Sequence, residues 1–368
     1  MIYLDNAATT KASCEVLENA TKYYLDNFYN PSALYRYGVK VSTDLAKIRE
    51  QISLIFGLKY ETIFTSCGTE SNNMVFNHFS KRGNIVTTLG EHSAIYEKAK
   101  DLKGKGVDIR FAKLNQDGSV NLQDLYSKID EKTTLVSVIH INNETGAVND
   151  IENIAKYIKQ KYSNIVFHSD GVQAFLKTDN KLNFVDLYSI SGHKIGAIKG
   201  IGCLIKRKNL HISPLIFGGG QEKGLRSGTE NVFAIKTLSL AIQNNIDYQQ
   251  NYKKVKEFKD YFVKNITNNC QIISSENSSP YIVCLSCVGL KSEVLLHMLE
   301  EDGVLIGTGS ACSKNAHSRV LTECGYKENV LQGVLRISFG FNTTLEDVKF
   351  CVEKLNNNIE KLKKVMKK

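Results

Sequence analysis

The chain has 368 residues, of which 42 % are hydrophobic and 23 % are charged, and its formal net charge is +9. These values are close to the globular average and exclude a disordered chain, a fibre and a small disulfide scaffold. The nine cysteines are odd in number, so they cannot all pair with one another. No basic and apolar leader opens the chain and no run of about 18 apolar residues occurs, so we expect a reduced, cytoplasmic protein without a membrane span.

Apolar periodicity predicts alternating helices and strands in the first two thirds of the chain. Apolar residues recur every three to four positions from Val41 to Ile55, and Gly57 then ends this helix. A further helix is predicted over 151–162, and strands are predicted over 63–66, 85–89, 134–139, 164–168 and 184–190. Strands that alternate with helices at this spacing predict βαβ units and a mostly parallel sheet.

The character of the sequence changes near residue 242, where Asn and Lys become common. Long polar helices are predicted over 247–266 and 344–368, with strands over 281–287 and 335–339 between them. We therefore expect a smaller α+β domain after a boundary near 244–251. The Lys-rich end is interpreted as a solvated helix terminus, and because aromatic residues are not interleaved with Arg, charge alone does not predict nucleic-acid binding.

Polar residues follow three successive strands of the predicted sheet. Asn143 follows the strand over 134–139, Asp170 and Gln173 follow the strand over 164–168, and Lys194 follows the strand over 184–190. Each cluster comes about one βα unit after the previous one. A single Asp there is usually a helix cap and a single Lys a surface residue, but three clusters at the carboxyl edge of one sheet favour a ligand site.

Lysine, aspartate and glutamine together suit pyridoxal phosphate. Lys194 can form a Schiff base, and Asp170 can keep the pyridine nitrogen protonated. Gly68 and Thr69 lie between a strand-like run and a helix, where free N–H groups attract a phosphate, although ordinary helix capping explains this pattern as well. His92 lies beyond another strand, where its ring could stack on the cofactor or be purely structural.

Two more segments carry candidate residues. Cys312 has small residues on both sides, which predicts an accessible loop and a reactive thiol. Arg226 and Thr229 belong to a glycine-rich segment that either binds an anion or forms a mobile loop. Other cysteines have apolar neighbours and are expected in the core (Cys203, Cys284, Cys351), and the CxxC at 284–287 lacks the second pair that a zinc site needs.

Several segments, in the same order, resemble those of the cysteine desulfurases of the NifS/IscS type, which are pyridoxal-phosphate enzymes of the class-V aminotransferase group. The resemblance extends from Tyr3 to Ser338. Its most specific parts are Thr69-Glu70-Ser71-Asn72-Asn73, Glu91-His92, Asn142-Asn143-Glu144-Thr145-Gly146, Ser191-Gly192-His193-Lys194, Arg226-Ser227-Gly228-Thr229-Glu230-Asn231-Val232 and Gly309-Ser310-Ala311-Cys312.

The resemblance implies the α/β fold of PLP-dependent transferases, fold type I. Residues 13–248 would form a large cofactor-binding domain with a mostly parallel sheet. Residues 1–12 and 249–368 would form a small α+β domain that carries the catalytic Cys312. The resemblance also implies a homodimer.

The resemblance further implies how the cofactor is held. Lys194 would bind it covalently and later move protons, Asp170 would pair with the pyridinium nitrogen, and Gln173 would hydrogen-bond the phenolic oxygen. His92 would stack on the ring. The phosphate would be held by Gly68, Thr69, Ser191 and His193, with Thr229 reaching in from the other subunit.

The implied reaction converts L-cysteine to L-alanine. Asn143 and Arg336 would bind the substrate carboxylate, Arg336 through a two-pronged ion pair. Cys312 would attack the substrate sulfur as a thiolate and become a persulfide. The sulfur acceptor is left open between an iron–sulfur scaffold and a tRNA sulfurtransferase, because the segment over 313–321 is shorter than in the IscS subgroup.

Two alternatives compete with this hypothesis. One is another class-V enzyme, either a selenocysteine lyase or an aminotransferase; an aminotransferase needs no thiol, so Cys312 disfavours it. The other is a basic tRNA- or protein-binding module with a degenerate site. The presence of Lys194, Asp170 and Cys312 argues against such a module.

Overall fold

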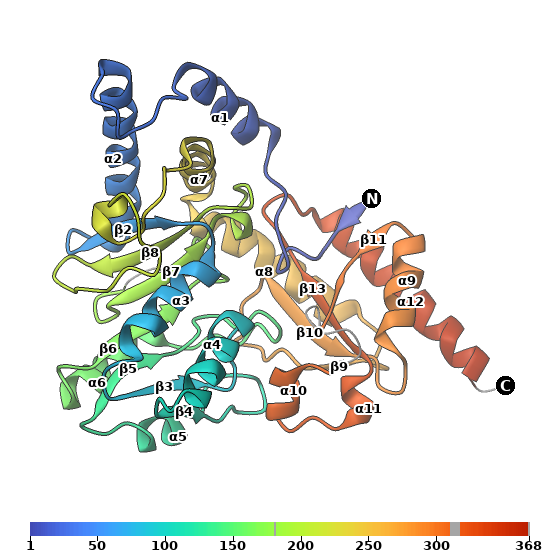
Figure 1. Cartoon of the computed structure of the whole chain (residues 1–368). Helices are drawn as coiled ribbons and strands as arrows, with labels where there is room; N and C mark the ends of the chain where they lie inside the picture. The colour runs from blue at the N-terminus through green and yellow to red at the C-terminus, as the bar shows by residue number, and fades with distance from the viewer. Residues whose placement is uncertain (180–181, 310–316, 367–368) are drawn as a thin grey trace.

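The computed structural model describes residues 1–179, 182–309 and 317–366. Figure 1 shows a large α/β part built around one sheet and, beside it, a smaller part formed by the end of the chain together with the N-terminal strand. The predicted nucleophile Cys312 lies outside the described residues. Within these residues, no helix has the length and apolarity needed to cross a bilayer.

The large part contains a seven-stranded sheet in the order β2-β8-β7-β6-β5-β3-β4. Only β8 runs antiparallel to its neighbours β2 and β7, and the remaining pairs are parallel. This confirms the predicted mostly parallel sheet. The strands are β2 (Tyr60–Thr65), β3 (Asn84–Thr88), β4 (Ile109–Ala112), β5 (Thr133–Ser137), β6 (Val166–Asp170), β7 (Leu187–Ser191) and β8 (Gly202–Arg207).

Helices cover both faces of this sheet, because its central strands are apolar on both sides. Leu135 and Val136 are adjacent on β5, yet they belong to separate cores. The core around Val136 includes residues of α2 (Arg36–Phe56), α6 (Ile151–Lys161) and α7 (Val232–Asn245), and the core around Leu135 includes residues of α3 (Gly68–Phe79) and α4 (Ser93–Gly104). Two further helices are α1 (Cys14–Asp26) and α5 (Leu122–Ser127).

The small part contains a four-stranded sheet in the order β12-β13-β10-β9. Its strands are β9 (Gln271–Ile272), β10 (Ile282–Ser286), β12 (Gly307–Thr308) and β13 (Val334–Ser338). The N-terminal strand β1 (Ile2–Tyr3) pairs in parallel with β11 (Val304–Leu305). The helices are α8 (Tyr248–Asn265), α9 (Ser292–Glu301), α10 (Arg319–Glu323), α11 (Glu328–Leu331) and α12 (Leu345–Met366).

We propose the domain division 13–248 against 1–12 with 249–368 on the basis of these pairings. The opening residues contribute Leu4 and Ala7 to the same apolar core as α8, α9 and α12. A chain whose first residues pack with its last part has to be divided in this discontinuous way.

Several predicted strand boundaries differ from the structure, and two of these differences concern the strands that lead to Asp170 and Lys194. The strand predicted over 184–190 begins only at Leu187, because the Asp186 carboxylate accepts a bond from Phe167 N (2.8 Å) and forms ion pairs with Lys159 and Arg207. The strand predicted to end at residue 168 continues to Asp170. Asp170 is therefore held on the sheet itself rather than in the loop after it.

The cysteines predicted to be core residues are buried. Cys203, Cys284 and Cys351 have no exposed surface, and burial raises the pKa of each thiol. Cys14 is exposed at the start of α1. Among the described residues, no cluster of His, Cys, Asp and Glu could hold a metal ion.

Two buried histidines predict how stability depends on pH. Burial lowers the pKa of His168 to about 3 and that of His140 to about 4. An unfolded histidine titrates near 6.5, so between that pH and the folded values the unfolded chain binds more protons. The free energy of unfolding should therefore fall as the pH is lowered from about 6.5, by about 1.4 kcal/mol per pH unit for each histidine.

This expectation is tested by denaturant unfolding at several pH values between about 7 and 5. In the wild type His168 is held by Ser137 Oγ (2.9 Å) and Ser189 Oγ (3.0 Å). His168→Gln should lower the free energy of unfolding at every pH. It should also reduce the dependence of that free energy on pH by the contribution of one histidine, about 1.4 kcal/mol per pH unit. An unchanged slope in this variant would contradict the assignment.

Candidate active site

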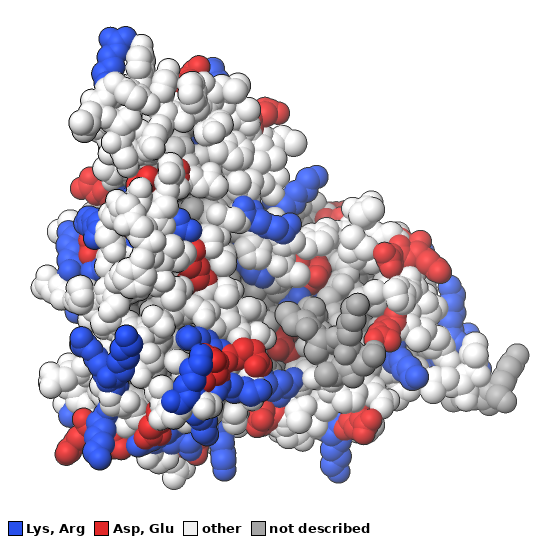
Figure 2. All heavy atoms as spheres, viewed as in Figure 1, with Lys and Arg blue, Asp and Glu red and all other residues white. Residues whose placement is uncertain are grey.

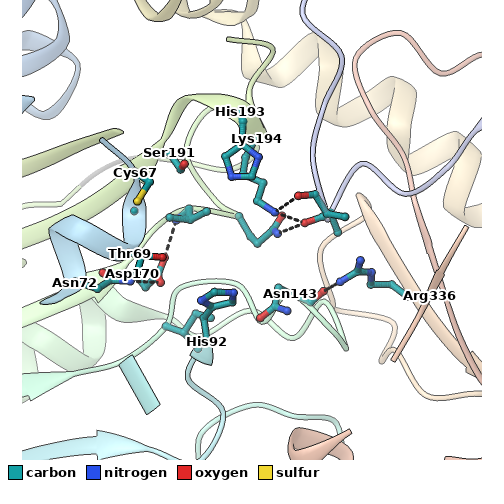
Figure 3. A pocket seen from close by; sticks show the side chains of 16 residues that line it. Cys67, Thr69, Asn72, His92, Asn143, Asp170, Ser191, His193, Lys194 and Arg336 are labelled. Atoms are coloured by element: carbon teal, nitrogen blue, oxygen red, sulfur yellow. Dashed lines mark hydrogen bonds between the residues drawn. The ribbon is translucent and has the colours of Figure 1, made fainter. Parts of the chain in front are cut away.

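A cavity of about 340 Å³ lies at the carboxyl ends of the large-sheet strands. It is closed on the other side by Ala7, Ala8 and Arg336, which come from the N-terminal segment and from β13. Figure 3 shows these side chains pointing into one space. Ten of the residues singled out in the sequence line it: Gly68, Thr69, His92, Asn143, Asp170, Gln173, Ser191, His193, Lys194 and Arg336.

One end of the cavity is built to hold an anion. The first N–H groups of α3 have no intrahelical acceptor, and Cys67 at the N-cap position gives no side-chain cap. The Ser191 hydroxyl is buried without a partner among the described residues. A Cβ on Gly68 would lie 2.6 Å from Val172 Cγ2, so only glycine lets the backbone fit this closely. Free N–H groups and a hydroxyl at a helix N-terminus suit a phosphate.

The carboxylate of Asp170 has a fixed orientation. Its side chain is buried; Oδ2 accepts a bond from Asn72 Nδ2 (2.7 Å), and Oδ1 accepts one from Val172 N (3.0 Å). Asn72 comes from α3, so the anion-binding helix and the carboxylate are held in one arrangement. Each of the two carboxylate oxygens therefore has its own donor, which fixes the plane of the carboxylate.

The His92 ring lies at the cavity wall as the N-cap of α4. Its Nδ1 accepts a bond from Ala94 N (3.2 Å), which leaves Nε2 to carry the proton. Burial is the main cause that lowers the pKa of His92, while the Asp170 charge opposes it. The neighbouring Glu91 is fully buried, and burial together with the Asp170 charge raises its pKa well above the usual value. His92 is therefore a neutral, flat ring.

Lys194 lies on the 3-10 turn that directly follows β7. Its Nζ donates to Ala8 O (2.7 Å) and also to Ala7 O, so the amine faces the N-terminal segment across the cavity. The neighbouring His193 bonds Thr9 Oγ1 through Nδ1 (3.1 Å). Burial and the Lys194 charge lower the pKa of His193 to about 4, so this imidazole is neutral near pH 7.

Arg336 places a cation at the other end of the cavity. It is buried on β13; Nη2 donates to Asp5 Oδ1 (2.7 Å), and Nη1 donates to Asn143 O (3.0 Å). Its Nε has no partner among the described residues. A buried guanidinium with an unused donor suits a carboxylate ligand, and Asn143 also lines the cavity at this end.

Thr229 is exposed and does not line the cavity. Its segment is nevertheless tied to the anion-binding end, because Arg226 Nε donates to Glu70 Oε1 (2.9 Å) in the first turn of α3. Glu222, at the base of the same segment, is buried and bonds Arg49 and Phe64 N. A single chain therefore leaves Thr229 outside its own site.

Sequence reasoning missed the contacts that orient the site residues. Asn72 and Asp5 each hold a site residue from a distant part of the chain. Both belong to segments that carry the family resemblance, but nothing in their spacing indicates their partners. The Ala7 and Ala8 carbonyls that receive the Lys194 amine carry no side-chain signal at all.

The aminotransferase class-V family matches residues 2–350 of the chain. The chain belongs to this family, whose members depend on pyridoxal phosphate. Within it, the chain is 34 % identical to a protein of Dictyoglomus turgidum named cysteine desulfurase IscS, over 99 % of this chain and 96 % of that relative. The chain thus falls among the cysteine desulfurases of the NifS/IscS type.

Solved structures agree with this assignment. A structure described as a NifS-like protein superposes with a TM-score of 0.91 at 31 % identity and covers 98 % of this chain and 99 % of its own. Another, described as SspA in complex with cysteine, has a TM-score of 0.81 at 29 % identity and covers 94 % of this chain and all of its own. These neighbours confirm the predicted fold.

The cavity residues fit pyridoxal phosphate. The unpartnered Ser191 hydroxyl and the α3 N-terminus match its phosphate, and the fixed Asp170 carboxylate matches a protonated ring nitrogen. The flat His92 ring and the Lys194 amine both line the cavity. Gln173 is buried, its Nε2 donates to Ala7 O (2.8 Å), and its amide oxygen has no partner within the described part of the chain.

Proposed function

We propose that the chain is a cysteine desulfurase that converts L-cysteine to L-alanine and passes the sulfur atom to Cys312. The observation that carries the proposal is the meeting of the Lys194 amine, the Asp170 carboxylate and the Arg336 guanidinium in one cavity. An amine, an anion and a carboxylate-binding cation are the groups that PLP chemistry on an amino acid requires. The relatives named cysteine desulfurase support the choice of substrate.

When bound, pyridoxal phosphate supplies an electron sink for bond cleavage next to an amino group. Each residue then has a distinct task. Asp170 would hold a proton on the ring nitrogen of the cofactor. Lys194 would anchor the cofactor, and its amine would carry protons to and from the substrate carbon. The neutral His92 ring would stack on the cofactor and could donate a proton from Nε2.

Substrate orientation is assigned to Arg336 and Asn143. The guanidinium receives the substrate carboxylate, which directs the thiol of L-cysteine away from β13 and into the cavity. Charge-assisted bonds of this kind are short and directional. The solved structure described as SspA in complex with cysteine, which is 29 % identical to this chain, supports the choice of cysteine as the substrate.

Cys312 is proposed as the sulfur acceptor because the chain on both sides of it is anchored at the cavity. Before it, Gly307 pairs with Arg336 in the β12–β13 ladder. After it, Ser318 Oγ donates to Glu144, and Arg319 Nη2 donates to Glu91 O (2.6 Å). A Cys312 thiolate that attacks the substrate sulfur would form an S–S bond and break the C–S bond, and the electron pair of that bond would take up a proton to give the methyl group of alanine.

The proposed function is tested by incubating the purified protein with L-cysteine and a thiol reductant. Alanine and sulfide should form in equal amounts. Selenocysteine as the preferred substrate would support a selenocysteine lyase, and amino transfer to a keto acid without sulfide would support an aminotransferase. A colourless protein that takes up no cofactor would support the binding-module alternative.

The Asp5–Arg336 contact leads to a kinetic prediction. Asp5→Asn removes the charge that holds Nη2, so the guanidinium is less well oriented for the substrate carboxylate. Loss of one bond to a charged group costs about 1.5–3 kcal/mol, so we expect KM for L-cysteine to rise about tenfold or more, with a smaller change in kcat. Steady-state alanine formation measures both constants.

A control separates this effect from a general loss of acidic charge. Asp101→Asn removes a surface carboxylate on α4 that pairs only with lysines of the same helix region. It should leave KM unchanged. An unchanged KM in Asp5→Asn would contradict the role given to this contact.

We propose a homodimer, in which Thr229 completes the phosphate site of the partner. An exposed apolar surface supports this proposal. The α1–α2 connection forms a cluster in which Tyr29 stacks on Phe28 (centroids 4.4 Å apart) and Tyr37 (4.9 Å), and Leu34 is 95 % exposed. Contiguous exposed apolar patches of this kind mark interfaces. Figure 1 shows α1 and α2 at the top of the molecule, on the large-domain side.

The dimer predicts that Leu34→Glu disrupts association. A charge placed in an apolar interface has to be desolvated, so the variant should sediment as a monomer and bind cofactor more weakly. Leu58→Glu is the matched control. Leu58 is 78 % exposed like Leu34 but lies beyond the opposite end of α2, so this substitution should leave association unchanged. Active wild-type monomers would contradict the dimer.

Finally, we propose a protein acceptor for the sulfur, either an iron–sulfur scaffold or a tRNA sulfurtransferase, in the cytoplasm. On the face shown in Figure 2, basic side chains are interspersed with acidic ones. This mixture favours protein contacts over a nucleic-acid surface. Transfer of radiolabelled sulfur from the loaded enzyme to each purified class of acceptor distinguishes the two.

A further inference from the structure

Two cysteines face each other at the ends of the neighbouring strands β9 and β10 in the small sheet. The proposed desulfurase reaction does not use either of them. Cys270 comes directly before β9, and Cys287 directly follows β10. In the antiparallel β9–β10 ladder, Ile272 pairs with Leu285 and Gln271 with Ser286. The next position of the same register pairs Cys270 with Cys287, and their Sγ atoms are 3.1 Å apart.

The backbone geometry at this pair suits a covalent link. Cys287 N donates to Gly333 O (2.9 Å), so the backbone polar groups of Cys287 face β13 and not β9. Cys270 and Cys287 are therefore a non-hydrogen-bonded pair, in which opposing Cα atoms approach to about 4.5 Å. Disulfides span Cα separations of about 4.4–6.8 Å.

The two thiols differ in character. Cys287 is buried, whereas Cys270 is partly exposed. The S–H of Cys287 bonds to Cys270 and lowers its pKa, and the nearby Lys363 of α12 acts in the same direction. The same bond, together with burial, raises the pKa of Cys287. Cys270 is thus the accessible, more acidic thiol, and Cys287 is a partner held in contact with it.

We propose that Cys270 and Cys287 are an oxidation site that forms an intramolecular disulfide with a peroxide as oxidant. The Cys270 thiolate attacks one peroxide oxygen, the O–O bond breaks, and hydroxide leaves to give a sulfenic acid. Cys287 then attacks the Cys270 sulfur, the S–O bond breaks, and water leaves as the S–S bond forms. The two sulfurs lose two electrons, the peroxide gains them, and two waters are released.

The disulfide would fasten the two-residue edge strand β9 to β10. A cross-link stabilises mainly by restricting the unfolded chain, so the oxidised protein should melt at a higher temperature. β10 also pairs with β13, the strand that carries Arg336. The link thus reinforces the sheet that supports the substrate end of the cavity, and it does not depend on the proposed function.

The test uses the full-length, cofactor-loaded enzyme, treated with a few equivalents of hydrogen peroxide and then alkylated in denaturant. Trypsin with a Glu-specific protease cleaves at Lys264, Glu276 and Lys291, which separates Cys270 from Cys287. We expect one disulfide-linked pair, 265–276 with 277–291, to appear and to vanish on reduction. The two alkylated free peptides should be depleted in the oxidised sample. Fragmentation between Cys284 and Cys287 identifies which cysteine is bonded.

Variants complete the test. Cys270→Ser should abolish the linked pair and the gain in melting temperature, whereas Cys14→Ser, which removes an exposed thiol on α1, should leave both unchanged. A Cys312→Ala background removes interference from oxidation of that thiol. Recovery of Cys270 and Cys287 as alkylated free thiols, or a link to Cys284 instead, would overturn the proposal.

Discussion

Replacing Lys194 by alanine is expected to lower alanine formation from L-cysteine by about a thousandfold or more. The variant loses both the proposed anchor of pyridoxal phosphate and the proposed proton carrier, and general acid–base catalysis alone is typically worth about 10²–10⁴ in rate. Both proposed roles rest on the position of Lys194, which lines the same cavity as Asp170. Turnover and the absorbance of bound cofactor are measured together.

Borohydride trapping distinguishes loss of chemistry from loss of folding. In the wild type, reduction should fix the cofactor to the peptide that contains Lys194, and in Lys194→Ala no peptide should be labelled. Lys199→Ala removes an exposed lysine from the same loop and should keep full turnover and label. Trapping on another lysine in the wild type would contradict the assignment.

The second large effect is expected from Cys312→Ala. This variant keeps every residue that lines the described cavity, so it should bind pyridoxal phosphate and remain yellow. It lacks the proposed sulfur acceptor, so sulfide and alanine formation should fall to background. Steady-state assays for alanine, with cofactor content measured in the same samples, test this.

A second thiol makes the comparison decisive. Cys67 also lines the cavity, at the anion-binding end. If Cys312→Ala kept full turnover while Cys67→Ala lost it, the sulfur acceptor would be Cys67. Cys14→Ser, which removes an exposed thiol at the start of α1, should behave as the wild type.

The sequence predicted the residues that gather at the sheet edge better than it predicted their partners. Asn143 and Lys194 each follow a strand of the same parallel sheet and Asp170 is the last residue of another, and parallel strands place their carboxyl ends together. This regularity of the fold can be read from spacing alone. The contact between Asp5 and Arg336 joins residues 331 positions apart, and no local pattern encodes it.

Register is the other feature that spacing does not reveal. Cys284 and Cys287 stand out in the sequence as a CxxC, yet the contact that forms is between Cys287 and Cys270. It depends on how β9 aligns with β10, which is fixed by the packing of the small domain. The antiparallel direction of β8 within the large sheet likewise follows from tertiary structure rather than from its own residues.

Transfer of sulfur from L-cysteine to Cys312 can be observed by mass spectrometry of the cofactor-loaded wild type after brief exposure to L-cysteine without reductant. The tryptic peptide 292–314 contains Cys312 as its single cysteine. This peptide should gain the mass of one sulfur atom and lose it on reduction. Alanine formation with no added sulfur on this peptide, or with the sulfur on another cysteine, would contradict transfer to Cys312.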